Sequence, residues 1–322
     1  MEYDIVGIGT ALIDFTPIKI EGNKKRIYEC NPGGSIANFL TAAARQGSRC
    51  AFLGKVGRDV FGGELKKALE ENGVDCRGMV MDPQHNTSCS FVSLDENGDR
   101  SFVFYRERMA DSMLAEEELN YEILRESRLL HVTSFALAGD ISYETILEGL
   151  RFVREREGAI TFDVNWRPFI WNGDLQKGKE RVSRVISYAD ILKVSEEEME
   201  EFTGCGMENA QEGANILMDM GPRIVVLTNG SGGSDFFTRN SRGHADACHV
   251  NAIDTTGAGD CCFAVFIHEL LRANARVLDA TCEQLKRALE FANLAASYCV
   301  LHRGGIASMP DRSIFSQKGN IE

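Results

Sequence analysis

A chain of 322 residues can bury a sizeable core, and its formal net charge of −13 disfavours nucleic acid or an anionic membrane as a partner. A hydrophobic fraction of 43% with only six prolines argues against disorder, and no stretch reaches the roughly 18 to 20 apolar residues of a membrane span. The ten cysteines include no CxxC pair, and a strand pattern begins at once, so we expect a cytoplasmic protein with reduced thiols.

The first strand is expected over residues 4–9, and it ends in a Gly-Ile-Gly segment that matches the start of a dinucleotide-binding fingerprint. Leu12 occupies the place of the third glycine, and no helical pattern follows, so we reject a nicotinamide site. The chain also has no GxxxxGK[ST] phosphate loop.

Two stretches of alternating residues predict a small β-sheet inserted into the chain, from segments of about 15–32 and 88–108. The rest alternates between apolar strands and helical patterns. Strands are expected near 51–56, 128–133, 159–163, 190–194 and 223–228. This order predicts an α/β fold over residues 1–322: one domain with a doubly wound, mostly parallel sheet, whose ligands gather at the carboxyl ends of the strands.

The most informative segment is Asp254-Thr-Thr-Gly-Ala-Gly-Asp260, which opens an apolar helix. Small residues at 257–259 let an anion approach the backbone N–H groups, and the helix dipole adds attraction. Asp260 would repel a phosphate but suits a base that deprotonates an alcohol beside one. The segment therefore indicates phosphoryl transfer to a hydroxyl. The alternative is a glycine-rich turn before a core helix.

A second glycine-rich loop, Asn31-Pro-Gly-Gly-Ser-Ile-Ala-Asn38, precedes an alanine-rich helix. Gly33 and Gly34 allow close approach of a ligand, and Asn38 offers both a donor and an acceptor, which suits a polyhydroxylated substrate. The alternative is a helix-initiating turn with a solvated Asn38. A Gly-Lys-Val-Gly-Arg-Asp segment then leads into another amphipathic helix.

With these three segments in this order, the chain resembles the ribokinase-like (pfkB) carbohydrate kinases from residue 3 to about residue 310. The resemblance implies a ribokinase-like α/β core with a β-sheet lid, ATP and Mg²⁺, and phosphorylation of a sugar hydroxyl. The small-molecule partners would be a sugar and ATP. Because the lid has exposed edges that a second subunit would cover, we expect a homodimer through it.

The resemblance also implies roles for individual residues. Asp260 matches the family's catalytic base, and Gly257, Ala258 and Gly259 match its anion hole. Asp254 and Thr256 match the site near which many members bind a monovalent cation such as K⁺. The sugar hydroxyls would be bound by Asp14, Gly33, Gly34 and Asn38. The alternative for Asp14 is a cap on a turn.

The nucleotide side is implied in the same way. Residues 194–204 resemble the family's NxxE segment, with Ser195 in place of the asparagine and Glu198 as the glutamate that would hold Mg²⁺ through water. Lys193 would reach the phosphates. The predicted nucleotide contacts are Lys193, Ser195, Thr228, Gly230, Gly257, Gly259 and Asn293. Cys261 and Cys262 are interpreted as core residues, with a redox switch as the alternative.

Two further segments bear on the sugar. Phe102-Val-Phe-Tyr-Arg106 resembles an element of fructokinases, and Asp163-Val-Asn-Trp-Arg167 one shared with 2-keto-3-deoxygluconate kinases. Arg106 and Arg167 are suited to a carboxylate or a phosphate. Phe104 replaces a tyrosine typical of the keto-acid enzymes, which favours fructose. The alternatives are 2-keto-3-deoxygluconate, another sugar or a nucleoside, and a non-catalytic module that binds sugar or nucleotide.

Overall fold

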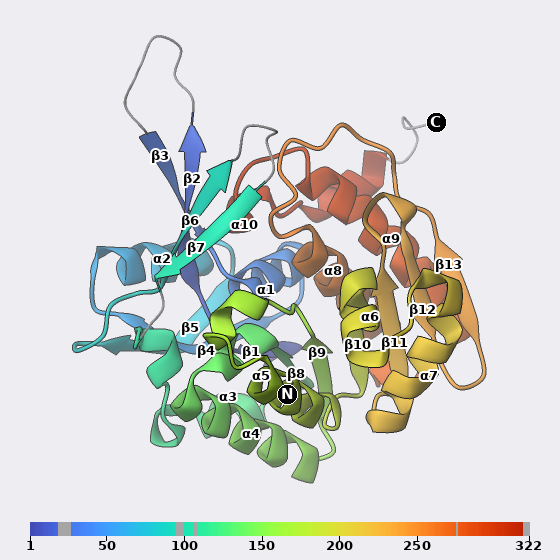
Figure 1. Cartoon of the computed structure of the whole chain (residues 1–322), viewed down its shortest axis with the longest axis horizontal. Helices are drawn as coiled ribbons and strands as arrows, with labels where there is room; N and C mark the ends of the chain where they lie inside the picture. The colour runs from blue at the N-terminus through green and yellow to red at the C-terminus, as the bar shows by residue number, and fades with distance from the viewer. Residues whose placement is uncertain (19–26, 95–99, 106–107, 275, 318–322) are drawn as a thin grey trace.

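The computed structural model describes residues 1–18, 27–94, 100–105, 108–274 and 276–317. These residues form a nine-stranded sheet in the order β13-β12-β11-β10-β9-β8-β1-β4-β5 and a separate four-stranded sheet in the order β3-β2-β6-β7 (Figure 1). Their arrangement matches the predicted α/β core with a small inserted sheet.

The large sheet is parallel from β5 to β11 and antiparallel at its β12–β13 end. Its strands are β1 (Ile5–Ile8), β4 (Cys50–Gly57), β5 (Val74–Asp82), β8 (Leu129–Thr133), β9 (Ala159–Asp163), β10 (Ile191–Ser195), β11 (Ile224–Thr228), β12 (Ser234–Phe237) and β13 (Arg242–Ala245). Every strand predicted for this sheet is confirmed, whereas β5, β12 and β13 were not predicted.

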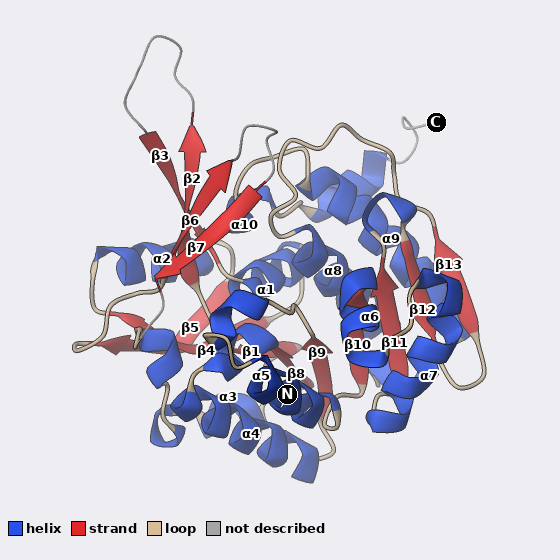
Figure 2. Ribbon diagram, viewed as in Figure 1, coloured by secondary structure: helices blue, strands red, loops and turns tan. Residues whose placement is uncertain are grey.

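Helices cover both faces of the large sheet, as the blue ribbons of Figure 2 show. One face packs against α1 (Ser35–Arg45), α2 (Val60–Glu71), α8 (Ala258–Ala273), α9 (Cys282–Cys299) and the short α10 (Gly305–Ser308). The other packs against α3 (Tyr121–Arg125), α4 (Asp140–Glu155), α5 (Leu175–Ile186), α6 (Glu196–Thr203) and α7 (Ala210–Met220). Among the described residues, no helix has both the length and the apolar character needed to cross a membrane.

The small sheet projects from the core and is built from β2 (Leu12–Ile18), β3 (Ile27–Gly33), β6 (Cys89–Leu94) and β7 (Arg100–Tyr105) (Figure 1). In its register Asp14 lies beside Ser90, which pairs with Phe104, so the three side chains share one face. Each of the two segments predicted for this sheet contributes a pair of antiparallel strands. We call this four-stranded unit the small sheet.

One buried carboxylate, that of Asp111, links the segments that lead into β2 and β6 at the base of the small sheet. Asp111, just beyond β7, accepts hydrogen bonds from the hydroxyls of Thr10, before β2, and Ser88, before β6, at 2.9 and 2.5 Å. Higher on the sheet, Phe15 packs edge-on against Phe61 of α2, with ring centroids 5.6 Å apart. The small sheet is therefore anchored both at its base and against α2.

The two adjacent glycines of α2 provide a matched test of how closely this helix packs against the end of β4. A Cβ at Gly62 would lie 2.0 Å from the carbonyl oxygen of Gly57, whereas a Cβ at Gly63 would meet nothing within 4 Å. We expect Gly62→Ala to destabilise the protein by about 2 kcal/mol or more through overpacking, and Gly63→Ala to stabilise it by about 0.5 to 1 kcal/mol through helix propensity. Urea unfolding midpoints measure both, and equal midpoints would contradict the packing.

Candidate active site

A cavity of about 490 Å³ lies between the small sheet and the carboxyl ends of β8 to β11. This is the edge at which the sequence predicts ligands. The predicted site residues that line it are Asp14, Gly34, Asn38, Phe104, Arg167, Lys193, Ser195, Glu198, Thr228, Thr256, Gly257, Gly259 and Asp260. Residues from both halves of the chain thus meet in one place.

Asp260 lies in the first turn of α8, and two side-chain amides hold its carboxylate. Asn38 donates to Oδ2 at 2.9 Å, and Asn165 donates to Oδ1 at 3.3 Å. Burial and the nearby carboxylate of Asp163 raise the pKa of Asp260 to about 7, against the Asn38 hydrogen bond and the positive charges of Lys193 and Arg167. A carboxylate with this pKa can accept a proton near neutral pH.

The start of α8 presents N–H groups to the cavity. Gly257 takes the left-handed conformation, with φ of 78°, which favours glycine. Within the described residues, Ala258 donates its N–H to the carbonyl of Thr255 at 3.2 Å, and no such partner is recorded for the N–H groups of Gly257 and Gly259. Of the three N–H groups predicted to bind an anion, that of Ala258 is thus engaged in the turn that begins the helix.

Asp14 forms the opposite wall, on the small sheet. The Ser90 hydroxyl donates to Oδ1 of Asp14, and the second carboxylate oxygen lies 2.9 Å from the position of a Cβ on Gly33. Burial raises the pKa of Asp14 to about 6, with a further contribution from the charge of Asp254. Asn38 Oδ1 is buried and has no hydrogen-bond partner among the described residues. This oxygen lies toward Gly305, 2.4 Å from the position of a Cβ there, so Asn38 packs closely against the start of α10.

The small sheet contacts the core across the cavity through aromatic rings. Phe104 stacks on Phe169 with ring centroids 4.8 Å apart and tilts against Phe135 at 5.3 Å. Arg167 is exposed and donates to the carbonyl oxygen of Trp166 at 2.8 Å. The predicted Arg106 lies outside the described residues.

A second cavity of about 360 Å³ adjoins the first, and the two share Thr228, Thr255 and Gly259. Gly230, Ala258 and Asn293 line it, as does the loop at 247–252. The side chain of Asn293 is engaged within the protein: its Oδ1 accepts from Ser234 at 2.9 Å, and its Nδ2 donates to the carbonyl of Ala245 at 2.8 Å. Asn293 therefore joins α9 to β12 and β13. Because both polar atoms of its amide are hydrogen-bonded within the protein, a nucleotide would contact Asn293 only by packing against the side of this amide.

Ser195 and Glu198 together cap α6. Ser195 accepts the N–H of Glu198, whose Oε2 accepts the N–H of Ser195 at 2.8 Å, while Oε1 accepts the N–H of Trp166 at 2.7 Å. With both oxygens accepting backbone N–H groups, Glu198 suits contact with a metal through water better than direct ligation. Exposed Glu197, which no pattern singled out, also lines the cavity.

The two residues predicted to bind a monovalent cation, Asp254 and Thr256, lie in the loop before α8. Asp254 is 2% exposed, and its two oxygens accept the N–H groups of Thr256 at 2.8 Å and Gly304 at 3.3 Å. Its carboxylate thus holds the loop before α8 against the segment before α10.

The adjacent cysteines of α8 are both buried. Contact with the Cys299 thiol and burial raise the pKa of Cys261 well above its usual range, and burial raises that of Cys262 to about 12. A thiol in this state carries little thiolate at neutral pH, which favours the core interpretation.

Asp163 and Asn165 belong to the Asp163-Val-Asn-Trp-Arg167 segment, but the sequence predicts no role for either residue. Asp163 is paired with Lys193, whose Nζ lies 2.9 and 3.0 Å from its two oxygens, and Asn165 contacts Asp260. The Asp-x-Asn spacing after a buried strand is the signal that could have identified them. Their partners, which come from distant segments, are visible only in the fold.

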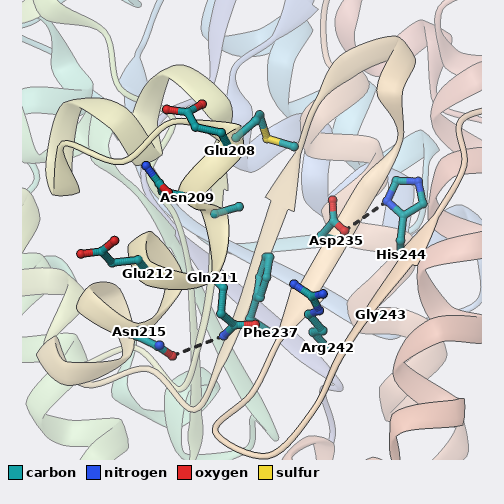
Figure 3. A pocket seen from close by; sticks show the side chains of 12 residues that line it. Glu208, Asn209, Gln211, Glu212, Asn215, Asp235, Phe237, Arg242, Gly243 and His244 are labelled. Carbon is teal, nitrogen blue, oxygen red and sulfur yellow. Dashed lines mark hydrogen bonds and ion pairs between the residues drawn. The ribbon is translucent and has the colours of Figure 1, made fainter.

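A larger hollow of about 730 Å³ lies elsewhere, between α7 and the β12–β13 hairpin (Figure 3). It is lined by polar side chains such as Glu208, Glu212, Arg242 and His244, and His244 pairs with Asp235 at 3.1 Å. None of the predicted site residues lines it. The predicted residues therefore point to the two adjoining cavities and not to this hollow.

Comparisons with known proteins agree with this geometry. The family model described as pfkB family carbohydrate kinase matches residues 3–312. Probable fructokinase-2 of Arabidopsis thaliana is 31% identical over 308 residues, 95% of this chain and 92% of that protein. Fructokinase-1 of Oryza sativa subsp. japonica is 31% identical over 95% of this chain and 94% of its own length.

Solved structures are similar over the whole length. The fructokinase of Xylella fastidiosa with bound ATP has a TM-score of 0.90 at 27% identity and covers 100% of both chains. A fructokinase double mutant of Vibrio cholerae O395 with fructose, ADP and potassium bound has a TM-score of 0.86 at 30% identity over 98% of both chains. The described residues have this ribokinase-like architecture, and the chain belongs to the pfkB family of carbohydrate kinases.

Proposed function

We propose that this chain is a fructokinase, which transfers the γ-phosphoryl group of ATP to a primary hydroxyl of fructose. The observation that carries the proposal is the position of Asp260, a buried carboxylate with a pKa of about 7 beside the N–H groups of Gly257 and Gly259. The fructokinases among its relatives support the choice of sugar.

In the proposed reaction the sugar lies between Asp14 and Asp260, and the nucleotide extends from Thr228 and Gly230 to the start of α8. Asp260 takes the proton of the sugar hydroxyl, whose oxygen forms a bond to the γ-phosphorus as the bond from that phosphorus to the bridging oxygen breaks. ADP leaves with the electron pair of that bond. The N–H groups of Gly257 and Gly259, with Lys193, bind the charge on the transferred group.

The residues present fit a magnesium ion and a monovalent cation. Glu198 through water and Glu197 offer carboxylate oxygens beside the phosphate region, and a magnesium ion bound there would neutralise phosphate charge. Asp254 fixes the loop that ends in Thr256, where potassium would be held. A structurally similar fructokinase has potassium bound, which supports a monovalent cation as a cofactor.

Fructose is favoured over 2-keto-3-deoxygluconate by the wall of the cavity. Phe104 presents a ring without a hydroxyl, packed between Phe135 and Phe169. A keto acid brings a carboxylate next to Asp14 and Asp260, which disfavours its binding through charge repulsion. Among the described residues, the exposed cation that would have to offset this repulsion is Arg167. We further propose that the small sheet, with segments 15–32 and 88–108, acts as a lid that excludes water during transfer.

The substrate assignment is tested by ADP release with ATP and Mg²⁺ across fructose, 2-keto-3-deoxygluconate, ribose and adenosine. We expect fructose to be the best substrate, and Asp260→Asn to lower kcat by about 10²-fold or more, because the base is lost. Turnover of the keto acid alone would reassign the sugar and keep the mechanism. Binding of sugar with no ADP release would support a non-catalytic module instead.

The pH dependence follows from the pKa of Asp260, which burial and Asp163 raise to about 7. The base acts only when deprotonated, so kcat/KM for the sugar is expected to be level above pH 7 and to fall about tenfold per pH unit below it. Initial rates between pH 5 and 9 measure this acid limb, the part of the profile in which kcat/KM falls as the pH decreases. A rate that stays level down to pH 5 would contradict a base with a raised pKa.

We also propose that two copies pair through the small sheet. Val103 and Tyr105 lie on its face opposite Asp14 and are 50% and 58% exposed, and Tyr105 packs against Phe91 at 5.6 Å. An apolar face on a sheet whose outer strands, β3 and β7, have no further strand partner among the described residues suits a second copy of the same sheet.

Light scattering after gel filtration tests this pairing. We expect a dimer, and Val103→Glu combined with Tyr105→Glu should yield a monomer of 35.6 kDa, because two charges would be buried at the contact. Ile141→Glu, an exposed apolar position on α4, is the control that should leave the dimer intact. A wild-type monomer at micromolar concentration would refute the pairing.

A further inference from the structure

The carboxyl ends of β9 and β10 hold a buried ion pair in which only Lys193 has been given a role. Asp163 ends β9 and lies directly beside Lys193 in the parallel register. The Lys193 Nζ is 2.9 and 3.0 Å from the two oxygens of Asp163, and the residues are 6% and 1% exposed. A buried charge without its partner is strongly unfavourable, so each holds the other in place.

Lys193 faces the place where a phosphoryl group would be bound. Its Nζ lies 3.1 Å from the position of a Cβ on Gly259, in the first turn of α8. Burial lowers the pKa of Lys193, but the carboxylates of Asp163 and Glu198 outweigh burial, and the pKa lies above its usual range. The ammonium is therefore charged and is held between Asp163 and the start of α8.

Asp163 is also connected to Asp260, through Asn165. The N–H of Asn165 donates to Asp163 Oδ1 at 3.2 Å, which stabilises a turn in which Asn165 has a φ of 41°, a conformation uncommon outside glycine. This turn directs the Asn165 amide toward Oδ1 of Asp260, at 3.3 Å. One carboxylate thus supports both the cation and the orientation of the base.

We propose that Asp163 is a positioning residue for phosphoryl transfer: it holds the Lys193 ammonium beside the phosphoryl site at Gly259 and, through the Asn165 turn, orients the Asp260 carboxylate. The proposal rests on the proposed kinase function. The charged groups that act on Asp260 are Asp163 from β9, Lys193 from β10 and Arg167 from the loop after β9. Without the charge of Asp163, Lys193 is left to pair with Asp260 or Glu198.

Asp163→Asn keeps the shape and the acceptor for Asn165 but removes the charge. We expect kcat to fall about 10- to 100-fold, because base and cation lose their alignment, with the KM for the sugar changed less than about threefold. The acid limb of kcat/KM should move down by about one pH unit, because the negative charge that disfavours ionised Asp260 is gone. A limb that stays at its wild-type pH would overturn the proposal.

Thr161→Val is the matched control on the same strand. Thr161 shares a 3.0 Å hydrogen bond with buried His131 and, among the described residues, makes no side-chain hydrogen bond to Asp163, Lys193 or Asp260, so this variant should lower the melting temperature without moving the acid limb. A limb that moves equally in both variants would mean that β9 acts only as a scaffold.

A double-mutant cycle with Lys193→Met covers the case in which Asp163→Asn folds poorly. The double variant leaves neither charge buried alone, so it should melt above Asp163→Asn. If Asp163 acts through Lys193, adding Asp163→Asn to Lys193→Met should cost less than about threefold in kcat/KM. Fully additive losses would refute the coupling. A wild-type chain inactive on every sugar would instead refute the proposed function itself.

Discussion

The burial of one carboxylate, Asp260, imposes the main constraint on this molecule. Removing an ionised carboxylate from water costs several kcal/mol unless hydrogen bonds and opposite charges offset it. The offset comes from Asn38 of α1, Asn165 after β9 and Lys193 of β10. Because these groups belong to three separate elements, the carboxylate is stabilised only when the elements come together, and even then its proton affinity stays high.

The elements meet because α8 is buried along nearly its whole length, from Asp260 to Leu271. Such a helix must be surrounded by apolar partners, and it packs in one core with α1, α9 and the strands of the large sheet. Its first turn is thereby fixed at the carboxyl ends of β10 and β11. The ordinary requirement to bury a helix places the N-terminal turn of α8 beside the cavity, with the Asp260 carboxylate in it.

The sequence predicts those parts of this arrangement that depend on local pattern. The buried parallel strands read as short apolar runs, and the glycine-rich segments mark close backbone approach, so β8 to β11 and the cavity at their ends were predicted. In contrast, β5 carries charged residues such as Asp75 and Arg77, and β12 and β13 have four residues each, which leaves little periodicity to detect.

Other details of this arrangement depend on tertiary contacts. Asn293 offers an amide in a suitable place, but Ser234 and Ala245 occupy that amide. Ala258 belongs to the predicted anion hole by sequence, but the turn before α8 uses its N–H. The pairing of Asp163 with Lys193 requires β9 and β10 to be neighbours in the sheet, which no local pattern reveals.

The two adjoining cavities have Thr228, Thr255 and Gly259 in common, so their occupants would touch the same backbone. A ligand that orders this shared wall changes the free energy with which the other cavity binds its own ligand. Thermodynamic linkage makes that effect reciprocal: the factor by which a nucleotide alters sugar affinity equals the factor by which the sugar alters nucleotide affinity. Any such coupling between the two binding equilibria would pass through this shared wall.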